Sequence, residues 1–198
     1  MLKFTEEDNI AKKPKGVDLI RLEGYQANFF RGAPLWKEVA WVICKNVFFL
    51  PRFPLPSRFR VLLLRLFGAT VGEGTVLRGG INITHPWRLV LGDHVWIGED
   101  VLIHNLSDVI IESNCCISQK AFLCAASHNF LLASFDLILK PIRVSSHSWI
   151  AAQVFVGPGV TIGSGSMARA GSVVLESVPA RTIVQGNPAI VHRTLDGS

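Results

Sequence analysis

An aliphatic residue returns every six positions through more than half of this chain of 198 residues. Fifteen such positions can be counted from Val71 onward, with two eight-residue steps and one longer break, and fourteen of them hold Ile, Leu or Val. The residue four places later is Ser, Thr, Ala, Val or Cys in thirteen of the fifteen units. The aliphatic series is Val71, Leu77, Ile83, Leu91, Ile97, Ile103, Ile111, Ile117, Leu123, Val144, Ile150, Val156, Ile162, Ala168 and Val174.

Each six-residue unit predicts a short strand that ends in a tight corner. One large inward residue fills the interior, and one small inward residue fits where the corner leaves little space. Three units close a triangular coil of 18 residues, and stacked coils pair through parallel strands about 4.8 Å apart. The sequence therefore predicts an all-β repeat, a parallel β-helix of about five coils that begin at Val71, Leu91, Ile111, Val144 and Ile162.

Glycine follows the aliphatic residue in five of these units, at Gly72, Gly92, Gly98, Gly157 and Gly163. We expect glycine at these positions to permit corner backbone angles that other residues avoid. The main alternative to the β-helix is an ordinary β-sandwich. A sandwich would show turn signals about every 8–12 residues, and the sequence lacks them.

The pattern divides the chain into three parts. Residues 1–67 lack the repeat and predict an N-terminal appendage, mostly helical or irregular, with amphipathic segments on either side of "PRFPLP". Residues 68–180 form the β-helix, and residues 181–198 form a C-terminal tail. Arg58, Arg60 and Arg65 lie among apolar residues of the appendage. The appendage either caps the open first coil, which we favour, or makes an interfacial membrane contact.

The longest break in the repeat falls in "LCAASHNFLLASFDLILKP", residues 123–141. No six-residue step is present from Asn129 to Pro141, which predicts a loop, residues 129–141, ejected from the third coil. A long loop in a compact repeat protein is usually functional. His128 lies at the corner from which this loop departs, whereas the other five histidines are expected to be polar residues of solvated strands or corners.

Composition narrows the class of protein, its partners and the compartment in which we expect it. The chain is 49% apolar with a formal net charge of +5, so we expect a folded, modestly basic protein with no nucleic-acid partner. Its four cysteines form no CxxC pair and are expected to be reduced in the cytoplasm. The N-terminus "MLKFTEEDN" lacks the apolar core of a signal peptide. The apolar run at residues 39–50 is too short and too polar to span a bilayer.

The sequence resembles the hexapeptide-repeat acyltransferases, in particular acetyltransferases of the WcaF type that act in the synthesis of colanic acid and other exopolysaccharides. The maltose and galactoside O-acetyltransferases are more distantly similar. The resemblance covers about Phe29 to Arg193 and rests on "LLRLFGATVG", "HPWRLVLGDHVWIGE", "CISQKAFLCAASHN", "KPIRV", "FVGPGVTIG" and "IVQGNPA". It implies a left-handed β-helix and an acetyl-CoA-dependent O-acetyltransferase whose acceptor is a sugar or a polysaccharide intermediate.

The same resemblance implies that His128 is the general base. Imidazole can remove the proton of an acceptor hydroxyl near neutral pH, and the hydroxyl then attacks the thioester directly. Cys124 is the competing candidate as a nucleophile, although we expect it to be a packing residue. The "WI" pair of the family corresponds to Trp149 and Ile150. Trp149 would then wall the acetyl pocket or pack in the core, and the backbone N–H of Ala152 would stabilise the thioester oxygen.

Asn105 and His128 are placed by the repeat on the same side of the triangle, one coil apart. The resemblance to the maltose and galactoside enzymes suggests that Asn105 binds the acceptor, and a corner Asn that satisfies backbone groups is the alternative. Coenzyme A is expected along the later coils, beside the small residues Ala170 and Gly171. Arg169, Arg181 and Arg193 are available for its phosphates, whereas Glu176 stands where the family often has Lys.

The family's active sites lie between the subunits of a homotrimer, and its loop reaches toward a neighbouring subunit. Five apolar residues of the loop fit such a contact: Phe130, Leu131, Leu132, Phe135 and Leu137. The alternatives are an N-acyltransferase acting on an amino sugar and a non-enzymatic β-helix scaffold. A γ-type carbonic anhydrase is excluded because the chain has no His-x4-His pair, and no metal is expected. We expect a cytoplasmic enzyme with possible peripheral contact at the inner face of the membrane.

Overall fold

The computed structural model describes residues 19–26 and 29–195. These residues form two compact units. One contains residues 29–127 and 138–195, and the other contains residues 19–26 and 128–137. The expectation about the N-terminal nine residues lies outside the described part of the chain.

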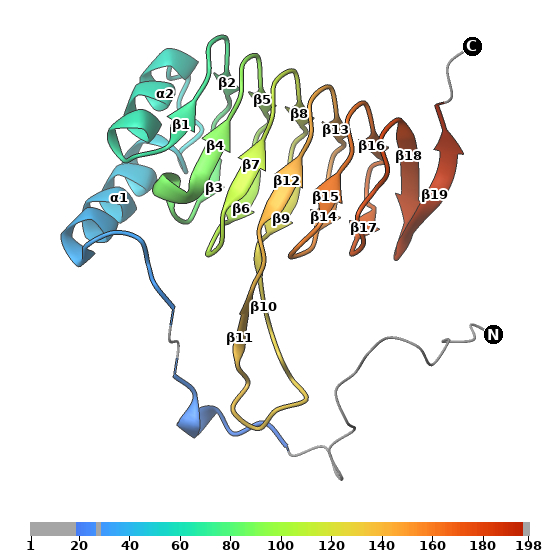
Figure 1. The fold of residues 1–198 in the computed structure, drawn as a ribbon. Coiled ribbons are helices and arrows are strands. Elements are labelled where there is room, and N and C mark those ends of the chain that lie inside the picture. The colour runs from blue at the N-terminus through green and yellow to red at the C-terminus, as the bar shows by residue number, and fades with distance from the viewer. Residues whose placement is uncertain (1–18, 27–28, 196–198) are drawn as a thin grey trace. The chain divides into compact units, whose positions relative to one another are not determined.

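The first unit is a left-handed parallel β-helix, with three sheets as its faces (Figure 1). One face contains β1 (Thr70–Val71), β4 (Leu89–Leu91), β7 (Val109–Ile111), β12 (Ile142–Val144) and β15 (Thr161–Ile162). The second contains β2 (Val76–Leu77), β5 (Trp96–Ile97), β8 (Cys116–Ile117), β13 (Trp149–Ile150), β16 (Met167–Ala168), β18 (Thr182–Gly186) and β19 (Ala189–Thr194). The third contains β3 (Asn82–Ile83), β6 (Leu102–His104), β9 (Phe122–Cys124), β14 (Phe155–Val156) and β17 (Val173–Val174).

The aliphatic series fills the interior as predicted. All fifteen positions are buried, and corresponding residues pair across the coils, as Leu77 with Ile97 and Ile97 with Ile117. Twelve of the fifteen small-residue positions are buried as well. The three that are not buried are Trp87, Ser107 and Ser127, where the first three coils end in a longer step or in the hairpin.

The corners correct the explanation given for glycine. The left-handed backbone angle falls just before the small inward residue, where Gly74 has a φ of 65° and non-glycine residues such as His94 and Asp100 have φ values of 56° and 58°. The glycines that directly follow the aliphatic residue have ordinary φ angles. A Cβ on Gly98 would lie 2.6 Å from the backbone nitrogen of Gln119 in the next coil, so close stacking is what requires glycine there.

The β-helix is longer than the predicted five coils. A sixth, partial turn begins where Val178 bridges Ile162, and β18 then pairs with β16 in parallel. β19 folds back on β18 in antiparallel fashion. Residues 182–194, assigned to a tail by the sequence analysis, therefore continue the second face. The repeat obscured this turn because the step from Val174 to Val178 is only four residues, although the buried Val184, which pairs with Ala168, follows Val178 by six.

Two helices cover the first coil: α1 (Leu35–Phe48) and α2 (Ser57–Leu66) (Figure 1). The indole N–H of Trp41 in α1 donates to the carbonyl of Ile83 at 2.9 Å, and Leu64 of α2 is fully buried. Both side chains belong to the same buried cluster as the aliphatic series. The helices occupy the position that the cap interpretation expects. In the described residues, no helix is long and apolar enough to cross a membrane.

The break in the repeat is a β-hairpin. β10 (Ala126–His128) and β11 (Leu137–Leu139) pair as a two-stranded sheet where the sequence analysis expected a loop from residue 129 to residue 141. The second compact unit contains the tip of this hairpin and a short 3₁₀ helix, η1 (Leu22–Gly24).

Candidate active site

His128 ends β10, and its ring is held by one residue across the hairpin. Its Nδ1 lies 2.9 Å from the backbone oxygen of Phe135, and the two rings stack with centroids 4.2 Å apart and planes 3° apart. A carbonyl oxygen can only accept, so Nδ1 of the neutral ring carries the proton and donates it. The lone pair is therefore on Nε2, which is the form a general base needs.

The position of Phe135 depends on an unusual backbone angle. Its φ is 50°, a left-handed value that is uncommon for a bulky residue. Its N–H donates to the backbone carbonyl of Leu132 at 3.0 Å, and the backbone N–H of Asn129 donates to the backbone carbonyl of Asp136 at 2.8 Å. These bonds hold the tip closed and direct the Phe135 carbonyl toward His128. Strain of this kind is commonly found at functional sites.

Tyr25 completes the aromatic surroundings of His128. Its ring meets the His128 ring edge-on at 5.5 Å and the Phe135 ring edge-on at 6.4 Å. The N–H of Arg21 donates to Ala133 at 2.9 Å and ties this segment to the hairpin tip. Sequence reasoning missed both aromatic roles. Phe135 was taken only as a partner contact, and Tyr25 lies in no motif, although it is the only tyrosine in the chain.

The rest of the hairpin tip remains apolar and exposed. Phe130 is 62% exposed, and Leu131 and Leu132 are each 41% exposed. Phe135 is accounted for by His128, whereas these three side chains pack against little within their own unit. They are three of the five residues from which a subunit contact was expected.

Asn105 is placed in the β-helix unit, and its side chain is already occupied. It is fully buried, its Oδ1 accepts from the backbone N–H of His85 at 2.9 Å, and its Nδ2 donates to the His85 carbonyl at 2.6 Å. This geometry is the structural alternative left open above, with the backbone of the preceding coil as the partner. Acceptor binding by Asn105 stays a prediction, and it would require these bonds to open.

Trp149 and Ala152 lie on the second face and at its corner. Trp149 points outward, is 46% exposed and donates its indole N–H to Ser118 at 2.8 Å, so it is not a core residue. The backbone N–H of Ala152 has no protein acceptor among the described residues. A free, half-buried N–H is what stabilisation of a thioester oxygen would use.

The corners after the second-face strands stack in a column. The backbone N–H of Gln153 donates to the backbone carbonyl of Gln119 at 3.1 Å, and that of Gly171 donates to the backbone carbonyl of Ala152 at 2.9 Å. Ala170 and Gly171 are exposed, and a Cβ built on Gly171 would meet nothing within 4 Å. The corner has room for a ligand to approach its backbone, and cofactor binding by Ala170 and Gly171 stays a prediction.

The three arginines proposed for the phosphates lie in and beside the last turn. Arg169 Nη1 donates to Gln185 at 2.6 Å, and Arg181 Nε donates to the carbonyl of Leu195 at 2.8 Å. Arg193 lies on β19 opposite Ile183. All three are exposed, as is Glu176. The structure therefore places the basic residues at one end of the β-helix, beyond the Ala170–Gly171 corner.

Four of the other five histidines and Cys124 have structural surroundings that explain them, and the buried His85 corrects the expectation that all five are solvated. His94 and His147 are corner residues with φ values of 56° and 63°. Burial lowers the pKa of His85 and the pKa of His104 below the ordinary histidine value, which disfavours their charged forms. Cys124 faces outward from β9, half-buried, and its thiol contacts the carbonyl of Ala126 at 3.2 Å, so it does not pack inward as expected. No group of three metal-ligating side chains occurs within the described residues.

Comparison with known proteins adds to this geometry. No family model matches the chain. It is 41% identical to the putative colanic acid biosynthesis acetyltransferase WcaF of Escherichia coli (strain K12), over 164 residues that cover 83% of this chain and 90% of that protein. It is 26% identical to the galactoside O-acetyltransferase of the same strain over 140 residues, 69% of each chain.

A solved structure has the same fold. It is a hexapeptide-repeat-containing acetyltransferase from Vibrio cholerae O1 biovar eltor, in complex with acetyl coenzyme A. The match has a TM-score of 0.77 at 25% identity and covers 88% of this chain and 97% of the Vibrio protein.

Proposed function

The chain belongs to the hexapeptide-repeat acetyltransferases, and from this membership we propose that it transfers an acetyl group from acetyl-CoA to a sugar hydroxyl. The observation that carries the proposal is the state of His128. Its Nδ1 is bonded to the carbonyl of Phe135, which leaves Nε2 free to take a proton. A chain of the same family with a free imidazole nitrogen on an ordered hairpin has the base that acyl transfer to a hydroxyl requires.

In the proposed reaction, Nε2 of His128 removes the proton of the acceptor hydroxyl as the oxygen attacks the thioester carbonyl. The N–H of Ala152 donates to the oxygen of the tetrahedral intermediate. The carbon–sulfur bond then breaks, and His128 returns the proton to the leaving thiolate. No covalent acyl-enzyme is formed, so Cys124 has no role in the transfer.

Binding of acetyl-CoA is assigned to the second face and its last corners. The exposed Ala170–Gly171 corner would lie against the pantetheine arm, and Arg169, Arg181 and Arg193 would meet the phosphates. The Vibrio relative was solved with acetyl coenzyme A. The galactoside O-acetyltransferase and WcaF relatives support a carbohydrate acceptor of the same broad class.

We include a homotrimer in the proposal, with active sites between subunits. The exposed Phe130, Leu131 and Leu132 of the hairpin tip support a subunit contact. A cytoplasmic enzyme with peripheral contact at the inner face of the membrane belongs to the same proposal. Sedimentation of the purified protein would give the trimer mass, and Leu131→Glu with Leu132→Glu would reduce that mass.

The experiment that tests the function measures thiol release from acetyl-CoA with a panel of neutral oligosaccharides, nucleotide-linked sugars and amino sugars. We expect release to depend on a hydroxyl acceptor and the product to be an ester that hydroxylamine cleaves. Transfer only to amino sugars, with an amide that resists hydroxylamine, would replace the proposal by the N-acyltransferase alternative.

A further inference from the structure

α1 is apolar on its exposed side as well as on the side that packs on the protein through Trp41 and Cys44. Six apolar residues of this helix are between 48% and 71% exposed: Leu35, Trp36, Val39, Val42, Ile43 and Val47. In contrast, the amine of Lys45 is half-buried and donates to Asn82 at 2.9 Å, and that of Lys37 lies 5.3 Å from the Trp87 ring centroid. A helix whose outer side faces water carries charged and polar residues there.

α2 also has apolar side chains on its exposed side, while Val61 and Leu64 pack inward beside one buried arginine. Arg60 is 2% exposed, and its guanidinium donates to the carbonyls of Phe48 and Phe53 at 3.0 and 2.9 Å. Leu62 and Leu66, on the opposite side of the helix, are 62% and 74% exposed. The charge inside is satisfied by backbone oxygens, whereas the apolar side chains outside have no protein to cover them. The outer apolar surface is defined here as the six residues of α1 with Leu62 and Leu66 of α2.

Both parts of this surface are turned toward the same end of the molecule. α2 packs on β1 and β2, with the Ser57 hydroxyl donating to the carbonyl of Leu77 at 3.2 Å. α1 packs on β3 through the bond from Trp41 to Ile83. Both helices pack against the first coil, at the end of the β-helix where the first coil lies (Figure 1). Their exposed sides therefore face away from the coils.

The charges around the outer apolar surface are almost all positive. Residues 29–67 contain seven Arg or Lys and one acid, Glu38, which already pairs with Arg31 at 2.8 Å. Arg58 is exposed and has no ion-pair partner among the described residues. A second copy of this chain would bring like charges together, whereas an anionic lipid surface complements both the apolar strip and its basic border.

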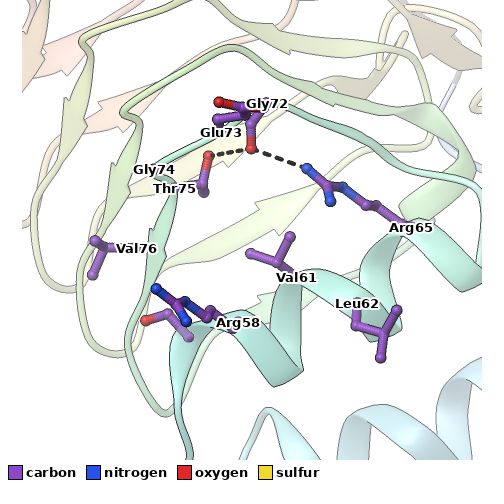
Figure 2. Close-up of a pocket in the computed structure, with 10 residues that line it drawn as sticks. Arg58, Val61, Leu62, Arg65, Gly72, Glu73, Gly74, Thr75 and Val76 are labelled. Carbon is purple, nitrogen blue, oxygen red and sulfur yellow. Dashed lines mark hydrogen bonds between the residues drawn. The ribbon is translucent and has the colours of Figure 1, made fainter.

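A pocket adjoins the outer apolar surface. Its volume is about 630 Å³, and it lies between α2 and the corner from Gly72 to Val76 (Figure 2). Arg65 is held on one side, because its Nη2 donates to the Gly72 carbonyl at 3.2 Å. Arg58 and Glu73 are the other charged residues of the lining, so its arginines outnumber its acid two to one, and Val61 and Leu62 supply apolar walls. Such a pocket fits the phosphate and glycerol of a lipid headgroup.

We propose that the outer apolar surface of α1 and α2 inserts into the headgroup region of an anionic membrane, with a lipid phosphate bound at Arg58. This assigns a surface to the peripheral contact of the proposed function. It also changes the residues expected to make that contact. Arg60 binds carbonyls inside the cap and Arg65 binds the first corner, whereas the guanidinium of Arg58 makes no hydrogen bond among the described residues.

The test is flotation of the full-length protein with vesicles of phosphatidylcholine, with and without phosphatidylglycerol. We expect binding that increases with phosphatidylglycerol and decreases with salt. Trp36→Glu with Ile43→Glu should reduce binding more than tenfold, because two carboxylates would enter the apolar layer. Arg58→Ala should reduce binding to the anionic vesicles about fivefold and leave binding to phosphatidylcholine unchanged.

The matched control is Ile190→Glu on β19, because Ile190 is 70% exposed, close to the 71% of Trp36, and lies at the other end of the β-helix. It should bind vesicles like the wild type. Circular dichroism and thermal melting establish that each variant is folded. Equal binding of wild type and Trp36→Glu/Ile43→Glu would overturn the proposal. So would a wild-type oligomer that these changes dissociate in the absence of vesicles, since the surface would then bind a second copy. Flotation needs no acetyl transfer, so it distinguishes this proposal from the proposed function.

Discussion

The coils and the hairpin are neighbouring stretches of chain, but their side chains are held in place in different ways. In the coils, each side chain is placed by its position in a six-residue unit, and the aliphatic series is buried throughout. In the hairpin, no such position exists, and the contacts are individual: the carbonyl and ring of Phe135 fix His128. Periodic packing provides rigidity, and the residue that could do chemistry lies where the period stops. The following predictions test this division.

The largest effect is expected from a cavity in the coils. Leu123→Ala removes a fully buried side chain of β9 and should lower the free energy of unfolding by about 2–5 kcal/mol. Leu131→Ala in the hairpin, at 41% exposure, should change it by less than about 0.5 kcal/mol. Chemical denaturation of both variants gives the two values. Equal losses would mean that the hairpin shares the core of the coils.

The two kinds of corner glycine should respond differently to substitution. Gly98→Ala places a Cβ 2.6 Å from the nitrogen of Gln119 and should cost about 1–3 kcal/mol in unfolding free energy, because neighbouring coils must separate. Gly171→Ala has open space but a φ of 73°, so it should cost about 1 kcal/mol. Asn at position 171 should recover part of that loss, since Asn tolerates the left-handed angle. Asn at position 98 should recover none, and recovery there would contradict the close-stacking explanation.

The stack on His128 is expected to act on the rate. Phe135→Ala should lower kcat about tenfold with little change in KM, because the imidazole loses the ring that holds its plane. Phe135→Tyr keeps the ring and should restore most of kcat. ¹⁵N NMR of His128 should show a smaller fraction protonated at Nδ1 in the alanine variant. A higher KM with an unchanged kcat would instead make Phe135 a substrate contact.

The smallest effect is a pH dependence that belongs to the coils. Burial lowers the pKa of His85 and of His104 from 6.5, so the unfolded chain binds more protons than the native one just below that pH. Their contribution is fully present above pH 6.5 and is lost as the pH falls through the lowered pKa values. Thermal unfolding between about pH 8 and about pH 5.5 should show this decrease.

His104→Gln should reduce the slope of that pH dependence, whereas His94→Asn, at an exposed corner, should leave it unchanged. The pKa of Glu112 is also lowered, through its bonds to Ser146 and Arg143 against an opposing desolvation, and its contribution is lost below its ordinary value of 4.5. It therefore acts outside this range. An unaltered slope in the His104 variant would show that the titrating groups lie elsewhere.

Much of the fold could be predicted because one short rule governs the coils. The large inward residue and the small one after it identify fifteen strands, and the family comparison agrees with the resulting β-helix. The partial sixth turn was missed because a four-residue step from Val174 to Val178 breaks the period, and the antiparallel hairpin of β18 and β19 ends the repeat after Val184. The role of Gly98 was misread because a sequence does not show how closely the next coil approaches.

The candidate site was less predictable because it depends on contacts that have no period. The break in the repeat indicated His128, but nothing in the sequence could show that Phe135 has a φ of 50° and directs its carbonyl to Nδ1. The hydrogen bonds between Asn105 and the backbone of His85 could not be predicted either, because they join residues of two neighbouring coils. For the N-terminal helices the sequence left a cap and a membrane contact open, and it could not show which apolar side chains of α1 and α2 are exposed.

The most direct test of the central claim is thiol release from acetyl-CoA by His128→Ala in the presence of a sugar acceptor. The account predicts a kcat lower by about 10²–10⁴-fold, with an unchanged melting temperature. His94→Asn, a histidine change at a coil corner, should keep wild-type activity. Full activity of His128→Ala would contradict the assignment of the base to the hairpin.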